Sequence, residues 1–143
     1  MGAYDPSELR ERVLRGIRRE LRRHPAVSSV AAAPAEPRIV ARLAADRLGL
    51  DADTKPTLTV RWYPGETVDA EPVFSFHFSD GTADCGWHYE PNPHVDGRGH
   101  YQERPEASAD YQYEACTFSS RQPTRVVWEV LDRLDERFGR GWP

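Results

Sequence analysis

The strongest constraint on the fold is the two-residue hydrophobic period that begins at residue 57. In TLTVRWY (57–63), leucine, valine and tryptophan alternate with other residues, and VFSFHFS (73–79) repeats the pattern with phenylalanine. Such alternation is typical of strands that bury one face. Three further strand candidates follow: DCGWHYE (84–90), GHYQE (99–103) and YQYEACTF (111–118). Short strands in succession predict an antiparallel meander of four to five strands over residues 57–118.

Three other segments have the 3.6-residue period of amphipathic helices, and they lie within residues 1–25, 37–49 and 122–138. Asp5 can cap the first helix, and Pro37 and Gly49 fit the start and end of the second. The connector between these two helices is expected to contain a short strand at 27–31. We therefore predict a single α+β domain over residues 1–143, with two N-terminal helices, the meander sheet, and a C-terminal helix packed on it.

Composition narrows the class of protein. With 38% hydrophobic and 10% aromatic residues, the chain can form a core and is not expected to be disordered. Its longest apolar run, VAAAPA, is shorter than the roughly 20 residues that span a bilayer, and charged residues follow Met1 where a secretory signal would be apolar. We expect a cytoplasmic protein without membrane contact, in which Cys85 and Cys116 are reduced thiols buried on strands.

Charge is distributed unevenly along the chain. Residues 1–25 hold seven arginines against four acids, a net +3, whereas residues 65–143 hold seven arginines against fifteen acids, a net −8. Arginines at helical spacing, among them Arg15 and Arg19, form a basic stripe on the first helix. The asymmetry favours an acidic partner for this helix, such as nucleic acid, or a contact within an oligomer; a solvated helix face remains the alternative.

The segment GWHYEPNPHVDGRGHYQE (86–103) holds three of the five histidines of the chain. If it forms a hairpin, the two-residue period places His88 and Tyr89 on opposite faces, and likewise His100 and Tyr101. Where His88 and His100 share a face, His77 on the preceding strand can join them. Two or three imidazoles would then line one surface.

Imidazoles near neutral pH can both donate and accept protons, which is what cleavage of RNA through its 2′-hydroxyl requires. In this hypothesis His94 and His100 form the acid–base pair, supported by His77 or His88. An arginine would steady the phosphate and tyrosines would stack on exposed bases. The candidate catalytic residues are His94, His100, His77 and His88, and the candidate substrate-binding residues are Arg98, Tyr101, Tyr89, Arg15 and Arg19. No metal or cofactor is expected in this mechanism.

Three alternatives stand beside this hypothesis. Cys85, His88, His94 and His100 are chemically acceptable zinc ligands, although their spacing is irregular. The histidines and tyrosines could instead be hydrogen-bonded across a structural hairpin. Lastly, the protein could be a non-enzymatic module that binds protein or nucleic acid with its sheet face and its basic N-terminal helix.

The segments FSFHFSDG, WHYEPNPHVDGRGHYQ and PTRVVWEVLDRL, within about residues 72–135, resemble the order of elements in the TumE-type family of small toxins. The resemblance implies matches at His77, at Asn92, Pro93 and His94, and at His100, and it adds Asn92 to the substrate-binding candidates. Pro91 departs from the pattern, and the histidines at 94 and 100 are single. The resemblance implies a toxin that acts on RNA and has a cognate antitoxin. Exposed sheet edges also make a homodimer plausible.

Overall fold

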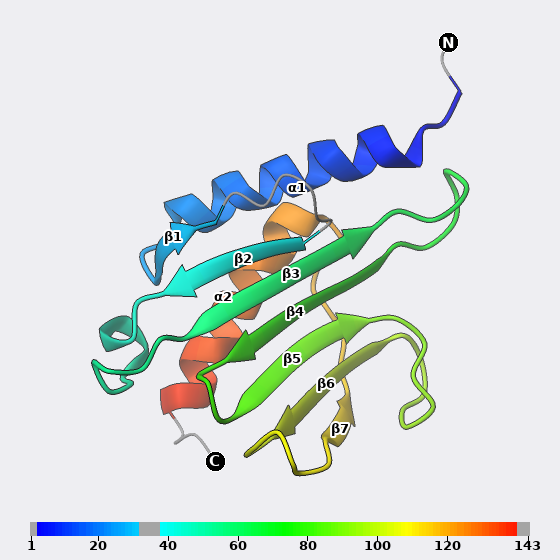
Figure 1. The fold of residues 1–143 in the computed structure, drawn as a ribbon. Helices are drawn as coiled ribbons and strands as arrows, with labels where there is room; N and C mark the ends of the chain where they lie inside the picture. The colour runs from blue at the N-terminus through cyan, green and yellow to red at the C-terminus, as the bar shows by residue number, and fades with distance from the viewer. Residues whose placement is uncertain (1–2, 32–37, 140–143) are drawn as a thin grey trace.

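The computed structural model describes residues 3–31 and 38–139. Its elements are α1 (Pro6–Arg23), β1 (Val27–Val30), β2 (Arg38–Leu43), the 3-10 helix η1 (Asp46–Leu48), β3 (Thr57–Tyr63), β4 (Val73–Ser79), β5 (Asp84–Tyr89), β6 (Gly99–Arg104), β7 (Gln112–Ala115) and α2 (Pro123–Gly139). The seven strands form one antiparallel sheet in sequence order, so every neighbouring pair is joined by a direct connection. Figure 1 shows α2 behind the central strands and α1 along the β1 side of the sheet.

The core lies between the two α-helices and one face of the sheet. Ile17 and Leu21 of α1 and Val127 and Leu134 of α2 have no exposed surface. They meet alternating side chains of the strands, and the largest fully buried ones are Phe76 and Phe78. Burial of this apolar area is the main stabilising contribution to the fold.

The strand register separates the two faces of the sheet. Val60 pairs with Phe76, Phe76 with Trp87, and Trp87 with Tyr101, so these side chains share the helix-covered face. The adjacent row, Thr59, His77, Gly86, Gln102 and Tyr113, belongs to the opposite face. Neither α1 nor α2 covers that side, which we call the open face (Figure 1).

Residues 38–49 correct the predicted topology. The second N-terminal helix and the count of four to five strands are wrong, because β2 and η1 occupy the described part of this range and β1 and β2 extend the sheet to seven strands. Ile39 and Leu43 fit a strand period as well as a helix period, whereas Ala41 fits only the strand period; all three are buried. Pairing of β2 with β3, with Ala41 opposite Leu58, decides between the two periods.

Other elements match their predictions. Asp5 caps α1, with its Oδ1 accepting hydrogen bonds from the backbone N–H groups of Ser7 (3.0 Å) and Glu8 (3.3 Å). β1 lies within the predicted short strand at 27–31, and α2 matches the predicted C-terminal helix. Of the two cysteines, Cys85 is buried as expected and Cys116 is only partly so. Neither described helix combines the length and apolarity needed to cross a membrane.

Candidate functional site

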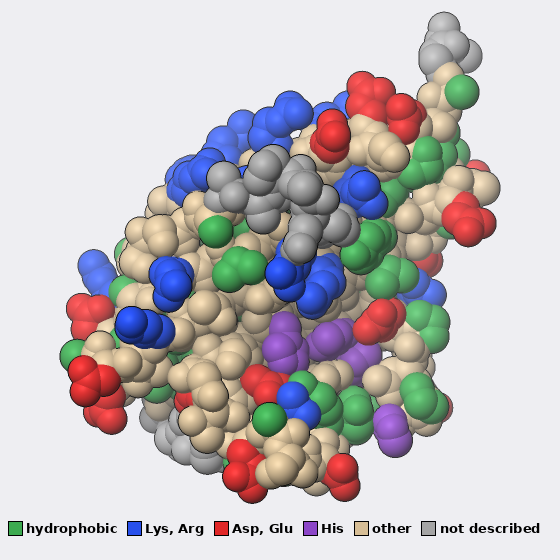
Figure 2. Space-filling view, in the orientation of Figure 1, with side chains coloured by type: hydrophobic (Ala, Val, Ile, Leu, Met, Phe, Trp, Pro, Cys, Tyr) green, Lys and Arg blue, Asp and Glu red, His purple; other side chains and the backbone are tan. Residues whose placement is uncertain are grey.

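His77, His88 and His100 lie side by side on the open face and form what we call the histidine cluster. They come from β4, β5 and β6, and His88 is paired directly with His100. Ring centroids are 5.6 Å apart for His77 and His88, and 4.9 Å apart for His88 and His100. Figure 2 shows this group of histidines near the middle of the face. The structure therefore confirms that the three imidazoles share one face of the sheet.

Gly86 makes room for the cluster. It pairs with His77 across β4 and β5. A Cβ at residue 86 would overlap the His77 ring and lie 3.0 Å from His88 Nε2. Because Gly86 has no side chain, the rings of His77 and His88 can pack against the backbone at residue 86.

His77 is held by a buried carboxylate. Its Nε2 lies 2.8 Å from Asp84 Oδ1, and Asp84 also accepts hydrogen bonds from Arg104 Nε (2.8 Å) and Tyr111 OH (2.6 Å). Burial tends to raise the pKa of Asp84, but the hydrogen bonds from Tyr111, Arg104 and His77 outweigh it and lower the pKa. The carboxylate fixes the orientation of His77 through this hydrogen bond.

His88 and His100 have a different environment. Burial, together with His77, His100 and Arg61, lowers the pKa of His88 to about 3, so His88 is neutral at physiological pH. His100 has no exposed surface. Both nitrogens of His88 and Nδ1 of His100 are buried and have no hydrogen-bond partner among the residues that the structure describes. A substrate on the surface cannot reach His100 in this conformation.

His94 is placed on the rim of a groove. It is exposed and stacks on Tyr113, with centroids 4.5 Å apart and planes 8° apart. Asn92 holds the loop, since its Oδ1 accepts a hydrogen bond from the His94 backbone N–H at 2.8 Å, and its Nδ2 lies 3.5 Å from His100 Nε2. The groove has a volume of about 600 Å³ and is lined by His94, Arg104, Ala109, Asp110, Tyr111, Gln112 and Tyr113.

Three predicted substrate-binding residues lie away from the cluster. Tyr101 shares the helix-covered face with Trp87, and their ring centroids are 5.0 Å apart. Tyr89 is on the same face and donates a hydrogen bond to Glu71 (2.9 Å). The guanidinium of Arg98 lies 5.1 Å from the centre of the Tyr89 ring. None of the three adjoins the histidines as the RNA hypothesis required.

Cys85 also belongs to the helix-covered face, where it pairs with Phe78 and has no exposed surface. It cannot share a zinc ion with His88, so the predicted four-ligand set is not assembled. Arg15 and Arg19 are exposed on α1 as predicted. Figure 2 shows the blue side chains that cover α1 at a distance from the purple histidines.

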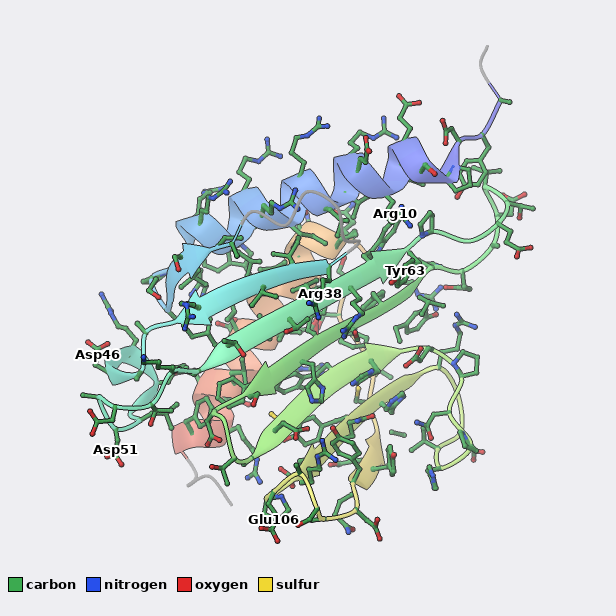
Figure 3. All side chains as sticks on the ribbon, viewed as in Figure 1. Arg10, Arg38, Asp46, Asp51, Tyr63 and Glu106 are labelled. Carbon is green, nitrogen blue, oxygen red and sulfur yellow. The ribbon has the colours of Figure 1, made fainter. Side chains whose placement is uncertain are left out.

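A second group of arginines does adjoin the cluster. Arg38 and Arg42 of β2 and Arg61 of β3 share the open face, because Arg38 pairs with Arg61 and Arg42 with Thr57. Neither β2 nor β3 contains an acidic residue. Figure 3 shows Arg38 beside β3 on this side of the sheet. Arg61 is close enough to contribute to the lowered pKa of His88.

Sequence reasoning missed Asp84, Arg104, Tyr111, Tyr113 and Arg61. Asp84 could have been found, because it shares the residue parity of Gly86 and His88 and therefore their face. The two tyrosines could not, since their positions depend on where β7 pairs along β6.

No protein-family model, curated protein or solved structure matches the chain. The resemblance to TumE-type toxins therefore stays a prediction, and the function must be argued from the site.

Proposed function

We propose that the protein binds single-stranded RNA on the open face of its sheet. One observation carries the proposal: the face that neither α-helix covers has arginines on β2 and β3 and a tyrosine-lined groove beside β7. A nucleic-acid strand crossing this face would meet cationic groups first and aromatic rings further along.

The arginines supply the electrostatic part of binding. Arg42 and Arg61 are exposed, and neither of their strands contains an acid that would offset their charge. Arginine recognises phosphate through paired N–H donors, and each neutralised phosphate releases counterions. Binding should therefore weaken steeply with salt.

The groove supplies the aromatic part. The His94 and Tyr113 rings are nearly parallel and stacked, and the ring centroids of Tyr111 and Tyr113 are 6.1 Å apart. Unpaired bases stack on such rings with little sequence preference, and each contact contributes about 1–3 kcal/mol. Single-stranded RNA exposes its bases, whereas a duplex conceals them.

RNA cleavage is a second candidate, favoured by the His77–Asp84 hydrogen bond of 2.8 Å. A carboxylate that orients an imidazole is a recurring feature of histidine acid–base catalysis. We assign the proton-transfer roles to His77 and the exposed His94, since neutral His88 and buried His100 are poorly suited to them. This reaction would suit the predicted toxin, whose antitoxin and homodimer also remain predictions.

The binding test measures fluorescence anisotropy of a labelled single-stranded RNA of mixed sequence at low salt. The variant Arg61→Glu reverses a charge on the open face, and its matched control Arg15→Glu makes the same change on α1. We expect Arg61→Glu to weaken binding at least about tenfold and to flatten the salt dependence, with little effect from Arg15→Glu. Equal effects of the two, or no binding by the wild type, would refute the open face as the site.

The cleavage test follows the same RNA on a gel in the presence of EDTA. Cleavage by the wild type that is lost in His94→Ala and His77→Gln supports the second candidate. The control is His24→Gln, because His24 packs against Trp128 of α2, away from the face. Intact RNA in every lane, with binding retained, would leave a binding module without catalysis.

A further inference from the structure

We propose that His88, His100 and Glu90 bind a divalent transition-metal ion, with zinc(II) as the representative. One ligand atom from each residue lies within 4.8 Å of the other two. The site lies on the open face where β5 leads into the hairpin loop. It does not depend on RNA binding, because none of the three residues has a role in the mechanism proposed above.

The register of the sheet brings the three side chains together. His88 and His100 are directly paired across β5 and β6. Glu90 follows His88 by two residues and so points to the same side, and its Oε1 lies 3.5 Å from His88 Nδ1. Two imidazoles and one carboxylate form a common ligand set for zinc and for other first-row metals.

Unsatisfied nitrogens are the independent sign of a ligand. His100 is fully buried, and within the described parts of the chain its Nδ1 has no hydrogen-bond partner. Both nitrogens of His88 are likewise buried atoms without such a partner there. Buried polar atoms are nearly always paired, because leaving one unpaired costs folding free energy. A metal ion that accepts a lone pair from each ring would remove part of this penalty.

Metal binding requires the two histidine rings to change their orientation. Ligand atoms of a tetrahedral zinc site are about 3.3 Å apart, as follows from metal–nitrogen distances near 2.0–2.1 Å. The parallel rings of His88 and His100 would need to tilt so that one nitrogen of each faces the ion.

The exposure of the ligands gives the ion a route into the site. The Glu90 side chain is 43% exposed, whereas that of His88 is 14% exposed, so an ion would first meet the carboxylate. Three protein ligands leave a fourth position for water. The imidazoles disfavour Mg²⁺ and Ca²⁺, which prefer all-oxygen sites.

The test measures zinc affinity by competition with a chromophoric chelator, on metal-free protein at neutral pH. We expect a single zinc ion to bind the wild type, and Co²⁺ in its place to give the visible absorption of a site with fewer than six ligands. Glu90→Gln and His88→Gln should each weaken zinc binding at least about tenfold, since loss of even an outer-shell contact costs 10–100-fold. Glu90 is part-exposed, so Glu90→Gln tests the site even if a histidine variant fails to fold.

The control is His94→Gln, which removes an exposed imidazole from the adjoining loop. It should bind zinc as the wild type does. If the wild type releases all its zinc to a chelator of micromolar affinity, or if His94→Gln loses as much affinity as Glu90→Gln, the proposed site is wrong. Stabilisation against heat by Zn²⁺ but not by Mg²⁺ in the wild type, absent from Glu90→Gln, gives a second readout that requires no RNA.

Discussion

His88 lies opposite His100 across β5 and β6, and their rings stack with planes only 9° apart. This relationship separates the histidines into two groups. His88 and His100 form an enclosed inner pair, and three of their four nitrogens have no hydrogen-bond partner among residues 3–31 and 38–139, whereas His77 is oriented by Asp84 and His94 is exposed. The inward pair suits a metal ion, and the outer pair suits contact with a ligand on the surface.

Gly86→Ala tests the space beneath the cluster. The new Cβ would overlap the His77 ring and approach His88, so both rings must move. We expect the free energy of unfolding to fall by about 1–3 kcal/mol, as measured by urea denaturation. The control is Gly16→Ala, in the interior of α1. Its Cβ would lie at an ordinary contact distance of 3.5 Å from the Thr124 side chain of α2, and the free energy of unfolding should rise by up to about 1 kcal/mol. An unchanged or more stable Gly86→Ala protein would show that the rings do not lie on β5.

Asp84→Asn tests the carboxylate network. The hydrogen bonds to Asp84 lower its pKa in the folded protein below the unfolded value of about 3.9, so its contribution to stability is present above that pH and is lost as the pH falls through the folded pKa. At pH 7 the variant should be about 1–3 kcal/mol less stable than the wild type. Urea midpoints measured from pH 7 to pH 2 should converge at the acid end. Exposed Asp51→Asn is the control, and a gap that does not depend on pH would contradict this account.

Much of the fold could be predicted because local pattern and tertiary packing agree. The alternation in TLTVRWY and VFSFHFS matches β3 and β4, and the stripe and cap of the first helix match α1. The helix predicted for residues 37–49 was wrong because Ile39 and Leu43 fit both the helix period and the strand period. Only pairing with the partner strand β3 distinguishes the two structures. In the site, parity predicted that His77, His88 and His100 share a face. It could not show that His100 is inaccessible or that Asp84 collects three hydrogen bonds, since both depend on neighbours far along the chain.

Ile39→Ala and Val40→Ala distinguish the strand from the predicted helix. In β2, Ile39 faces the core with no exposed surface and Val40 faces the open side. We expect Ile39→Ala to lower the free energy of unfolding by about 2–5 kcal/mol and Val40→Ala by less than about 1 kcal/mol, in chemical denaturation. In a helix with both residues on its apolar stripe, the two losses would be similar. Similar losses would therefore overturn the strand assignment.

The two cysteines should differ in reactivity. Burial raises the pKa of Cys85 to about 12, so at pH 8 only about one molecule in 10⁴ carries its thiolate, the reactive form. Burial also raises the pKa of Cys116, but this residue is less enclosed. With a chromogenic disulfide reagent we expect one thiol to react in the native protein and the second only on unfolding. Cys116→Ser should abolish the native reaction and Cys85→Ser should keep it. Rapid reaction of both thiols in the native wild type would mean that Cys85 is accessible and that β5 does not enclose it.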